Sequence, residues 1–475
     1  MASGASLLFL SRGVFAQSGD PTDLDIVSAG KLIRSGDLSP VDLVDAYLDR
    51  IDQFNSQINA YITVTGQAAR VRARELEAEL VNGRWRGPMH GIPIALKDNM
   101  DTAGIRTTAA SAVYADRVPD ADAEVVRRLQ DAGAIILGKL NMHEFAYGAT
   151  SAISHFGPVR NPWNSRRIPG GSSGGSGAAV AARLCAGALG TDTGGSIRIP
   201  AAYCGIVGLK PTYGLASIRG IIPLMFSLDH VGPMCRTVAD AAVVLQAIAG
   251  YDAKDIPSIK TDVPNYSSAI GRNVSTFRLG VPHDIFYDGI DAQIMAATET
   301  AISFLDDMTA GTQTVELPPR PEGTALIVEA YEYHADLLGE NSDLYDEVTL
   351  GRIMRGAKVS ATDYAGYLAK MKLDRKAIDA VFDDVDLIIS PTMARLPVPI
   401  DNARDEVDGP TLIRNTSPFN YYGIPTMSVP CGFSNEVLPI GLQISGPGLG
   451  EVDVFALAHA YEQKTTWHER MPVLG

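Results

Sequence analysis

The chain has 475 residues, of which 46% are hydrophobic and 20% are charged, and its formal net charge is −15. This balance can bury a large core and excludes an intrinsically disordered protein. The acidic charge argues against direct nucleic-acid binding, because phosphate contacts need clustered Lys and Arg. The length allows several domains or one large α/β domain. We expect one domain, since the sequence contains no internal repeat and no linker-like segment.

The first 21 residues form an N-terminal extension to a domain expected over residues 22–475. Residues 5–10 are a short apolar run, and residues 14–17 are similar to an export cleavage site. No basic segment precedes the run, and Arg12 interrupts the apolar stretch. Two interpretations stay open: a remnant of a signal peptide on a periplasmic or secreted protein, or a tail on a cytoplasmic protein. No membrane-spanning helix is expected, since no uninterrupted apolar stretch reaches about 20 residues.

Helix and strand patterns alternate after about residue 22. Ser39 and Pro40 mark a helix start, and apolar residues then recur at helical spacing. The apolar run that ends at Lys97 predicts a buried strand that places a lysine at its end. Further helices are expected over residues 67–80, 122–132 and 178–184, and after Thr237, Gly289, Ser360 and Gly450.

Later strands are expected over residues 134–137, 279–281, 387–389, 426–429 and 440–444. Such alternation predicts an α/β domain with a central sheet covered by helices on both faces. Residues 215–235 and 310–365 have the weakest patterns. We expect these two segments to form loops or a cap over a pocket.

The cysteines and histidines do not indicate a metal site. The four cysteines are scattered without ligand spacing, so we expect buried free thiols. His143-Glu144 starts like a zinc-helix motif, but residue 147, where the second histidine would stand, is Tyr147. Neither a metal nor an organic cofactor is expected.

Two glycine-rich turns with embedded serines carry the chemistry: residues 169–176 (PGGSSGGS) and 191–200 (TDTGGSIRIP). Glycine lets backbone N–H groups approach a reacting carbonyl closely. Amide hydrolysis needs a nucleophile, a base, an acid for the leaving amine and donors for the oxyanion. Serine with a neutral lysine can supply the first three. Burial would lower the pKa of Lys97 toward neutrality, and the apolar run before it offers such a setting.

Residues 170–214 resemble the amidase signature family, and residues 91–99, 156–163 and 438–443 extend the resemblance to nearly the whole chain. The resemblance implies a single domain with a central mixed sheet. It further implies that Ser196 is the nucleophile, Ser172 a bridging serine after a cis peptide bond, and Lys97 the base. The proton would pass from Ser196 through Ser172 to Lys97 and back to the leaving nitrogen, and the same relay would activate water against the acyl-enzyme.

The resemblance also implies supporting roles around these three residues. Asp192 and Arg198 would hold the loop of the nucleophile. Ser173 would either join the hydrogen-bond network or cap the helix that follows. The Tyr147 hydroxyl is a candidate contact to the substrate. The oxyanion hole would consist of the backbone N–H groups of Thr193, Gly194, Gly195 and Ser196.

An alternative lies in the same motif, because residues 170–174 also satisfy G-x-S-x-G, the nucleophile elbow of α/β-hydrolases. Ser172 would then be the nucleophile of an esterase, with His459 or His468 as its base. An elbow follows a strand directly, however, and residues 166–169 are a poor strand. A phosphate-binding loop is excluded because no lysine stands at the required position.

The family includes stand-alone amidases and the glutaminase subunit of glutamyl-tRNA amidotransferase. The resemblance implies that such glutaminases hold the glutamine amino group with an acidic residue about a dozen positions before a Gly-x-Pro. Residues 412–416 (LIRNT) precede Gly423-Ile424-Pro425 here and contain no acid. A glutamine ammonium would therefore lose its partner.

We therefore expect a stand-alone amidase that acts on a small non-peptidic or aromatic amide. A non-catalytic binder and a partner-dependent amidotransferase subunit stay open as alternatives, and family members commonly form homodimers. The side chains available for an apolar acyl pocket are Ile221, Ile222, Met225 and Phe226.

Overall fold

A computed structural model describes residues 19–321 and 324–475. The predicted signal remnant or tail lies outside the described residues, apart from its last three positions. Within the described part of the chain, no helix is both long and apolar enough to cross a membrane.

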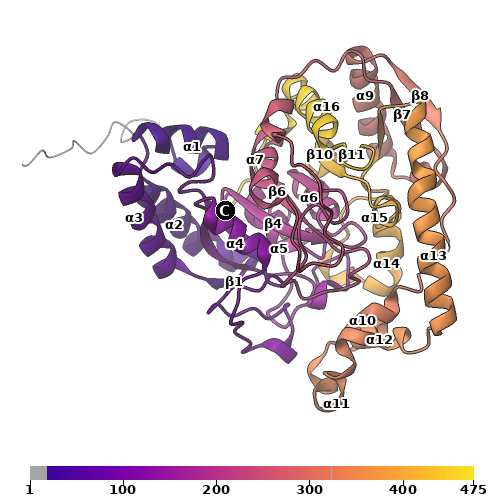
Figure 1. Cartoon of the computed structure of the whole chain (residues 1–475), viewed down its shortest axis with the longest axis horizontal. Helices are drawn as coiled ribbons and strands as arrows, with labels where there is room; N and C mark the ends of the chain where they lie inside the picture. The colour runs from indigo at the N-terminus through magenta and orange to yellow at the C-terminus, as the bar shows by residue number, and fades with distance from the viewer. Residues whose placement is uncertain (1–18, 322–323) are drawn as a thin grey trace, which may run out of the picture.

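The described residues form one mixed sheet of eleven strands in the order β1-β3-β2-β4-β6-β5-β10-β11-β9-β7-β8 (Figure 1). The strand β2 runs parallel to β3 and β4, and β7 runs parallel to β8 and β9; the other pairs are antiparallel. The predicted mixed sheet is thus confirmed. The strands are β1 Tyr61–Val64, β2 Pro93–Lys97, β3 Ile135–Leu140, β4 Gly187–Asp192, β5 Val207–Lys210, β6 His230–Cys235, β7 Leu279–Pro282, β8 Thr312–Val315, β9 Leu387–Pro391, β10 Thr426–Phe433 and β11 Pro439–Ser445.

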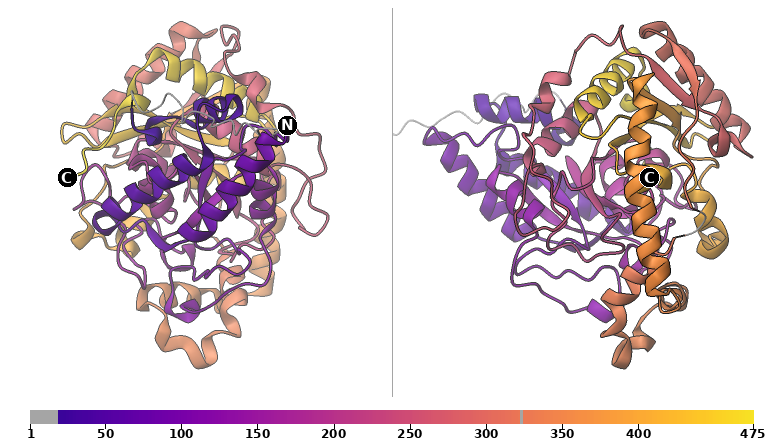
Figure 2. Two further views of the ribbon diagram at one scale, coloured as in Figure 1. Left: turned by 90° about the vertical axis from the view of Figure 1, so that its left-hand side faces the viewer. Right: turned by 45° about the vertical axis from the view of Figure 1, so that its right-hand side comes forward.

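Helices cover both faces of this sheet, as predicted (Figures 1 and 2). Side chains an odd number of residues apart on a strand point to opposite faces. A Cβ at Gly441 of β11 would lie 2.7 Å from Ala202 of α6. Gly446 follows β11 directly, and its N–H continues the strand pairing by donating to the Pro425 carbonyl at 3.1 Å. A Cβ at Gly446, five residues after Gly441, would lie 3.0 Å from Val454 of α16. The helices α6 (Arg198–Cys204) and α16 (Glu451–Lys464) therefore pack on opposite sides.

Local sequence signals explain where several helices begin. The helix α2 (Pro40–Ile58) starts where predicted, because the Ser39 hydroxyl accepts a hydrogen bond of 3.0 Å from the Val41 N–H. The other α-helices are α1 Ile26–Ser35, α3 Gly66–Val81, α4 Glu124–Asp131, α5 Gly174–Ala181, α7 Val238–Ile248, α8 Asp284–Tyr287, α9 Ala292–Met308, α10 Ile327–Ala335, α11 Leu338–Asn341, α12 Glu347–Gly356, α13 Ala361–Ala377, α14 Asp405–Leu412 and α15 Ser417–Tyr422.

The two segments expected to form loops or a cap over a pocket contain regular structure. Residues 310–365 include β8 and the helices α10, α11 and α12, and residues 215–235 end in β6. The strand β6 has the sequence HVGPMC, in which glycine and proline lower strand propensity. The strand β8 is only partly buried, so its apolar pattern is weak.

Candidate active site

The site lies where two parallel strands end. The neighbours β2 and β4 run in the same direction, so their carboxyl ends meet at one edge. Lys97 is the last residue of β2 and Asp192 the last of β4. The turn after β4 carries Ser196, and Ser172 stands two residues before α5. The structure thus brings Lys97, Ser172 and the turn of Ser196 together.

Lys97 is a fully buried amine in contact with Ser172. Its Nζ lies 2.7 Å from Ser172 Oγ and 2.7 Å from Thr191 Oγ1, and its side chain is fully buried. Burial lowers the pKa of Lys97 to about 7, although the carboxylates of Asp229 and Asp192 oppose this shift. A substantial fraction of the amine is therefore neutral near pH 7, as a base requires.

The backbone of Ser172 is fixed in position by hydrogen bonds to its carbonyl. A cis peptide bond joins Gly171 to Ser172, as the resemblance implies. The Ser172 carbonyl accepts hydrogen bonds from the His143 N–H at 3.0 Å and the Ser151 hydroxyl at 3.2 Å. These contacts leave the Ser172 hydroxyl to face Lys97.

Ser173 joins the network and does not cap α5. Its hydroxyl donates to the Thr191 carbonyl at 3.2 Å, and its N–H donates to the Ser196 carbonyl at 3.2 Å. The Ser173 side chain makes no capping hydrogen bond to α5, whose first N–H, that of Gly174, donates to the Ser151 hydroxyl at 3.1 Å. Of the two roles expected for Ser173, the structure therefore supports the network.

Ser196 is the member of the three that borders solvent. It is 8% exposed, whereas Lys97 and Ser172 are 0% exposed. Within residues 19–321 and 324–475, the Ser196 hydroxyl makes no hydrogen bond to another side chain. It is therefore free to rotate toward a substrate carbonyl or toward Ser172.

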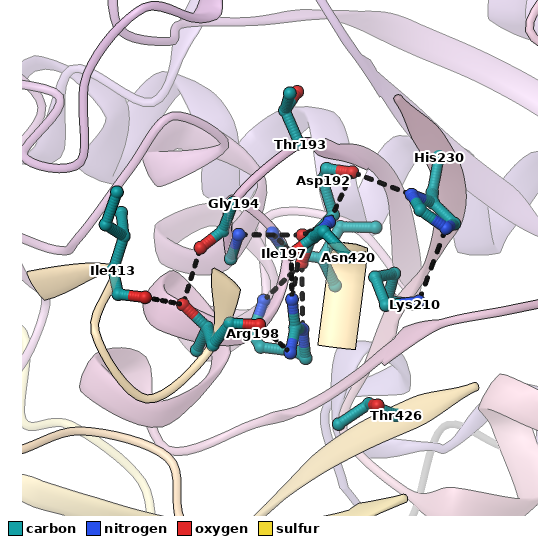
Figure 3. Close-up of polar contacts among 12 residues, drawn as sticks. Asp192, Thr193, Gly194, Ile197, Arg198, Lys210, His230, Ile413, Asn420 and Thr426 are labelled. Carbon is teal, nitrogen blue, oxygen red and sulfur yellow. Dashed lines mark hydrogen bonds and ion pairs between the residues drawn. The ribbon is translucent and has the colours of Figure 1, made fainter. Parts of the chain in front are cut away.

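The turn that carries Ser196 is fixed by a buried ion pair (Figure 3). Asp192 accepts hydrogen bonds from the Gly195 N–H at 2.7 Å and the Ile197 N–H at 3.1 Å, and it pairs with Arg198 at 3.0 Å. Burial alone would raise the pKa of Asp192, but the charge and hydrogen bonds of Arg198 outweigh it and hold the pKa below its usual value. The Arg198 guanidinium also donates to Asn420 Oδ1 at 2.6 Å, the Thr416 carbonyl at 2.9 Å and Gln443 Oε1 at 3.3 Å.

The oxyanion donors differ from the sequence expectation at Gly195. Its N–H is engaged by Asp192, so it is not available to a substrate oxygen. Elsewhere in the described structure, the amides of Thr193, Gly194 and Ser196 have no acceptor. Gly195 is required for another reason: its φ is +133°, and a Cβ there would lie 2.1 Å from Thr416 Oγ1.

Sequence reasoning missed several residues that hold the site. Thr191 contacts Lys97, and the Asn99 side chain donates to Thr191 Oγ1 at 3.2 Å. Both lie within the quoted segments, residues 91–99 and 191–200, so their position in these segments was the available signal. Asp229 and Asn420 contact the turn from distant segments, and nothing in the local sequence marks them.

The residues expected to contact the substrate belong to different packing clusters. Tyr147 packs beside buried clusters that contain Met225 and Ile222. Ile221 packs against the main core, and Phe226 is 44% exposed. Their role in substrate binding stays a prediction.

The nucleophile-elbow alternative finds no support in the structure. Residues 166–169 form no strand. The Ser172 hydroxyl contacts Lys97, and His459 accepts instead from the Gly271 N–H at 3.2 Å. In the chain as described, no histidine hydrogen-bonds to the Ser172 or Ser196 hydroxyl.

Comparisons with known proteins identify the family of this chain. The family described as Amidase matches residues 42–455, so the chain belongs to the amidase family. It is accordingly an amide-hydrolysing enzyme.

All four cysteines are buried and unbonded, and no group of three or more His, Cys, Asp or Glu that could hold a metal occurs in the described residues.

Several individual proteins are similar over nearly their whole length. A glutamyl-tRNA(Gln) amidotransferase subunit from Moorella thermoacetica is 39% identical, over 94% of this chain and 97% of the relative. The native peptide amidase from Stenotrophomonas maltophilia superposes with a TM-score of 0.82 at 34% identity, covering 95% of this chain and 98% of the amidase. The 6-aminohexanoate cyclic dimer hydrolase gives a TM-score of 0.84 at 29% identity, covering 95% of this chain and 99% of the hydrolase.

Proposed function

We propose that the chain hydrolyses a carboxylic amide to an acid and ammonia or an amine through an acyl-enzyme on Ser196. The observation that carries this proposal is the contact of 2.7 Å between Ser172 and a fully buried Lys97 whose pKa is lowered to about 7. A buried neutral amine can accept a hydroxyl proton near neutral pH.

The proposed reaction has two halves. Ser196 Oγ attacks the amide carbon while its proton passes to Ser172 and the Ser172 proton passes to Lys97. The N–H groups of Thr193, Gly194 and Ser196 stabilise the oxyanion, and one such donor is typically worth about 10²–10³ in rate. The C–N bond then breaks as the relay returns a proton to the leaving nitrogen. Water, deprotonated by the same relay, finally cleaves the ester.

The surroundings of the turn favour an apolar or aromatic acyl group. Ile413 is 36% exposed, and its side chain would lie 3.8 Å from a Cβ at Gly194 (Figure 3). The Thr416 hydroxyl donates to the Gly194 carbonyl at 2.6 Å, which holds this segment against the turn. Residues 412–416 thus adjoin the oxyanion turn and carry an isoleucine where a glutaminase would need an acid. We therefore propose a stand-alone amidase.

A second candidate is a glutaminase that passes ammonia to a partner protein. Its support is the 39% identity with the glutamyl-tRNA(Gln) amidotransferase subunit from Moorella thermoacetica. Such an enzyme would hydrolyse glutamine and co-purify with further proteins.

The homodimer stays a prediction, for which the measurement is the mass of the purified protein in solution.

The proposed nucleophile can be tested with a serine-reactive phosphonyl fluoride and peptide mapping. We expect the label on Ser196 of the wild type and no label in Ser196→Ala. A label on Ser172 would contradict the assignment, and so would labelling that survives in Ser196→Ala.

The substrate class is tested by comparing turnover of aromatic and aliphatic amides with turnover of L-glutamine. Preference for the apolar amides supports the stand-alone amidase. Faster release of ammonia from glutamine, lost in Ser196→Ala, would instead support the glutaminase of an amidotransferase.

A further inference from the structure

Asp229 is a buried carboxylate that the relay does not use. It lies immediately before β6 and is 4% exposed. Its Oδ1 accepts from the Thr193 hydroxyl at 2.5 Å and from the Met225 N–H at 3.2 Å, and its Oδ2 accepts from the Leu224 N–H at 2.9 Å. One carboxylate therefore ties together two separate segments: the oxyanion turn and the loop over residues 222–228.

That loop is also fixed along the rest of its length. The Ile222 carbonyl accepts from Asn99 at 3.3 Å. The Ser227 N–H and hydroxyl both donate to Glu329 of α10, at 3.0 Å and 2.6 Å. Arg375 of α13 donates to the Ser227 carbonyl at 3.0 Å. The loop is thus a rigid support, and Asp229 transmits its position to the turn.

We propose that Asp229 is a positioning residue that aligns the oxyanion hole through the Thr193 side chain and fixes it to the loop that carries Met225. This inference rests on the proposed function. The Thr193 N–H is one of the donors left without an acceptor among the described residues, and the hydrogen bond from the Thr193 hydroxyl restrains the rotation of that residue. Donors held in place before the reaction need no reorganisation as charge develops on the substrate oxygen.

Asp229 also faces the base. Its negative charge favours the protonated form of Lys97, as the charge of Asp192 does. The other titratable groups that interact electrostatically with Asp229 include the carboxyl of Glu329 and the hydroxyl of Tyr213. Replacing Asp229 with a neutral residue should therefore lower the pKa of Lys97 further, in addition to loosening the turn.

The test is the second-order rate constant for labelling of Ser196 by the phosphonyl fluoride, measured across pH. In this step Ser196 Oγ bonds to phosphorus, fluoride leaves, and the serine proton enters the relay. The variants are Asp229→Asn, Thr193→Val, the double variant, and Thr193→Ser as the matched control that keeps the hydroxyl. We expect both single variants to react about 10- to 100-fold more slowly, a fraction of the effect of losing a whole donor.

Two further results distinguish positioning from general damage. The double variant should be no slower than the slower single variant, because both changes act on the same hydrogen bond. Thr193→Val removes its donor, and Asp229→Asn replaces its charged acceptor with a weaker neutral one. The acid limb of the rate profile should move to lower pH in Asp229→Asn and stay in place in Thr193→Val. Thr193→Ser should react faster than Thr193→Val, because it keeps the hydroxyl that donates to Asp229.

The inference is overturned if Asp229→Asn reacts as fast as the wild type, if the two losses multiply, or if Thr193→Ser is as slow as Thr193→Val. If Asp229→Asn does not fold, the labelling rates of Thr193→Val and Thr193→Ser are sufficient to test the inference. Failure of the proposed function is a separate result, since the wild type itself would then carry no label on Ser196.

Discussion

Lys97 and Lys139 are both fully buried lysines, and their partners differ. Lys139 Nζ lies 3.6 Å from the Asp98 carboxylate and donates to the Met100 carbonyl and the Thr107 hydroxyl, each at 2.6 Å. Lys97 contacts only hydroxyl and carbonyl oxygens among the described residues. Burial lowers the pKa of Lys139 to about 8 and that of Lys97 to about 7. A carboxylate in contact favours the ammonium, so Lys97 is the better suited of the two to act as a base.

The rate of acylation should follow the protonation of Lys97. The ammonium form of Lys97 cannot accept the proton of Ser172, so we expect the labelling rate of Ser196 to rise with pH through about 7 and then to level off. The measurement is the labelling rate across neutral pH, from well below to well above the pKa of Lys97. A rate that stays flat over this range would contradict the role of Lys97. Lys97→Arg, which keeps the positive charge at every pH tested, serves as the control and should react at a low, pH-independent rate.

At the scale of single elements, the sequence predicted best where local signals and burial agree. The strand β2 was predicted from its uninterrupted apolar run, and its five residues are all buried. The start of α2 was predicted from Ser39 and Pro40, which act within a few residues of each other. The strand β4 (GALGTD) was not predicted, because its glycines give no periodic pattern and its place between β2 and β6 depends on the whole sheet.

The turn between β4 and α6 should depend on the charge of Asp192. In Asp192→Asn, the fully buried Arg198 loses its counter-ion, and removing one partner of a buried pair typically costs about 3–5 kcal/mol. We expect the free energy of unfolding to fall by about that amount, measured by urea denaturation. The exposed Asp307→Asn is the matched control and should change stability by less than about 0.5 kcal/mol. Equal stabilities of the two variants would show that the ion pair does not hold the fold.

At the scale of the whole molecule, some residues of the candidate site lie in sequence motifs, and others reach the site only through the topology of the sheet. Lys97, Ser172 and Ser196 lie in short motifs that the sequence displays directly. Asp229 and Asn420 reach the turn only because β4, β6, β5 and β10 are consecutive in the sheet. Contacts between segments 36 and 228 residues apart leave no local pattern, so a single sequence cannot predict them.

Two buried carboxyl groups should make the stability of the whole protein depend on pH. Asp240 accepts from the Val27 N–H at 3.1 Å and Glu462 from the Val238 N–H at 2.9 Å, so both lie at the start of α7. Burial raises the pKa of Asp240 to about 7 and that of Glu462 to about 8. Both groups bind protons more tightly in the folded state. The stability they contribute is fully present below their unfolded pKa of about 4 and is lost as the pH rises through the folded values.

In Glu462→Gln, we expect the loss of stability as the pH rises from about 4 to about 8 to be smaller than in the wild type, because one of the two titrating groups is gone. Thermal unfolding at a series of pH values measures this. Glu340→Gln, at an exposed position, is the control and should follow the wild-type curve. A Glu462→Gln curve with the full wild-type slope would contradict the assignment.

The graded exposure of Ser196, Ser172 and Lys97 bears on where the protons of the proposed reaction come from. Water can reach the relay at Ser196, which is 8% exposed, but not at Ser172 or Lys97. Once an amide substrate is bonded to Ser196, Lys97 holds a proton that has no path to solvent except through the leaving group. In the proposed mechanism, the hydrogen delivered to the departing amine is therefore the one that the Ser196 hydroxyl carried at the moment of attack.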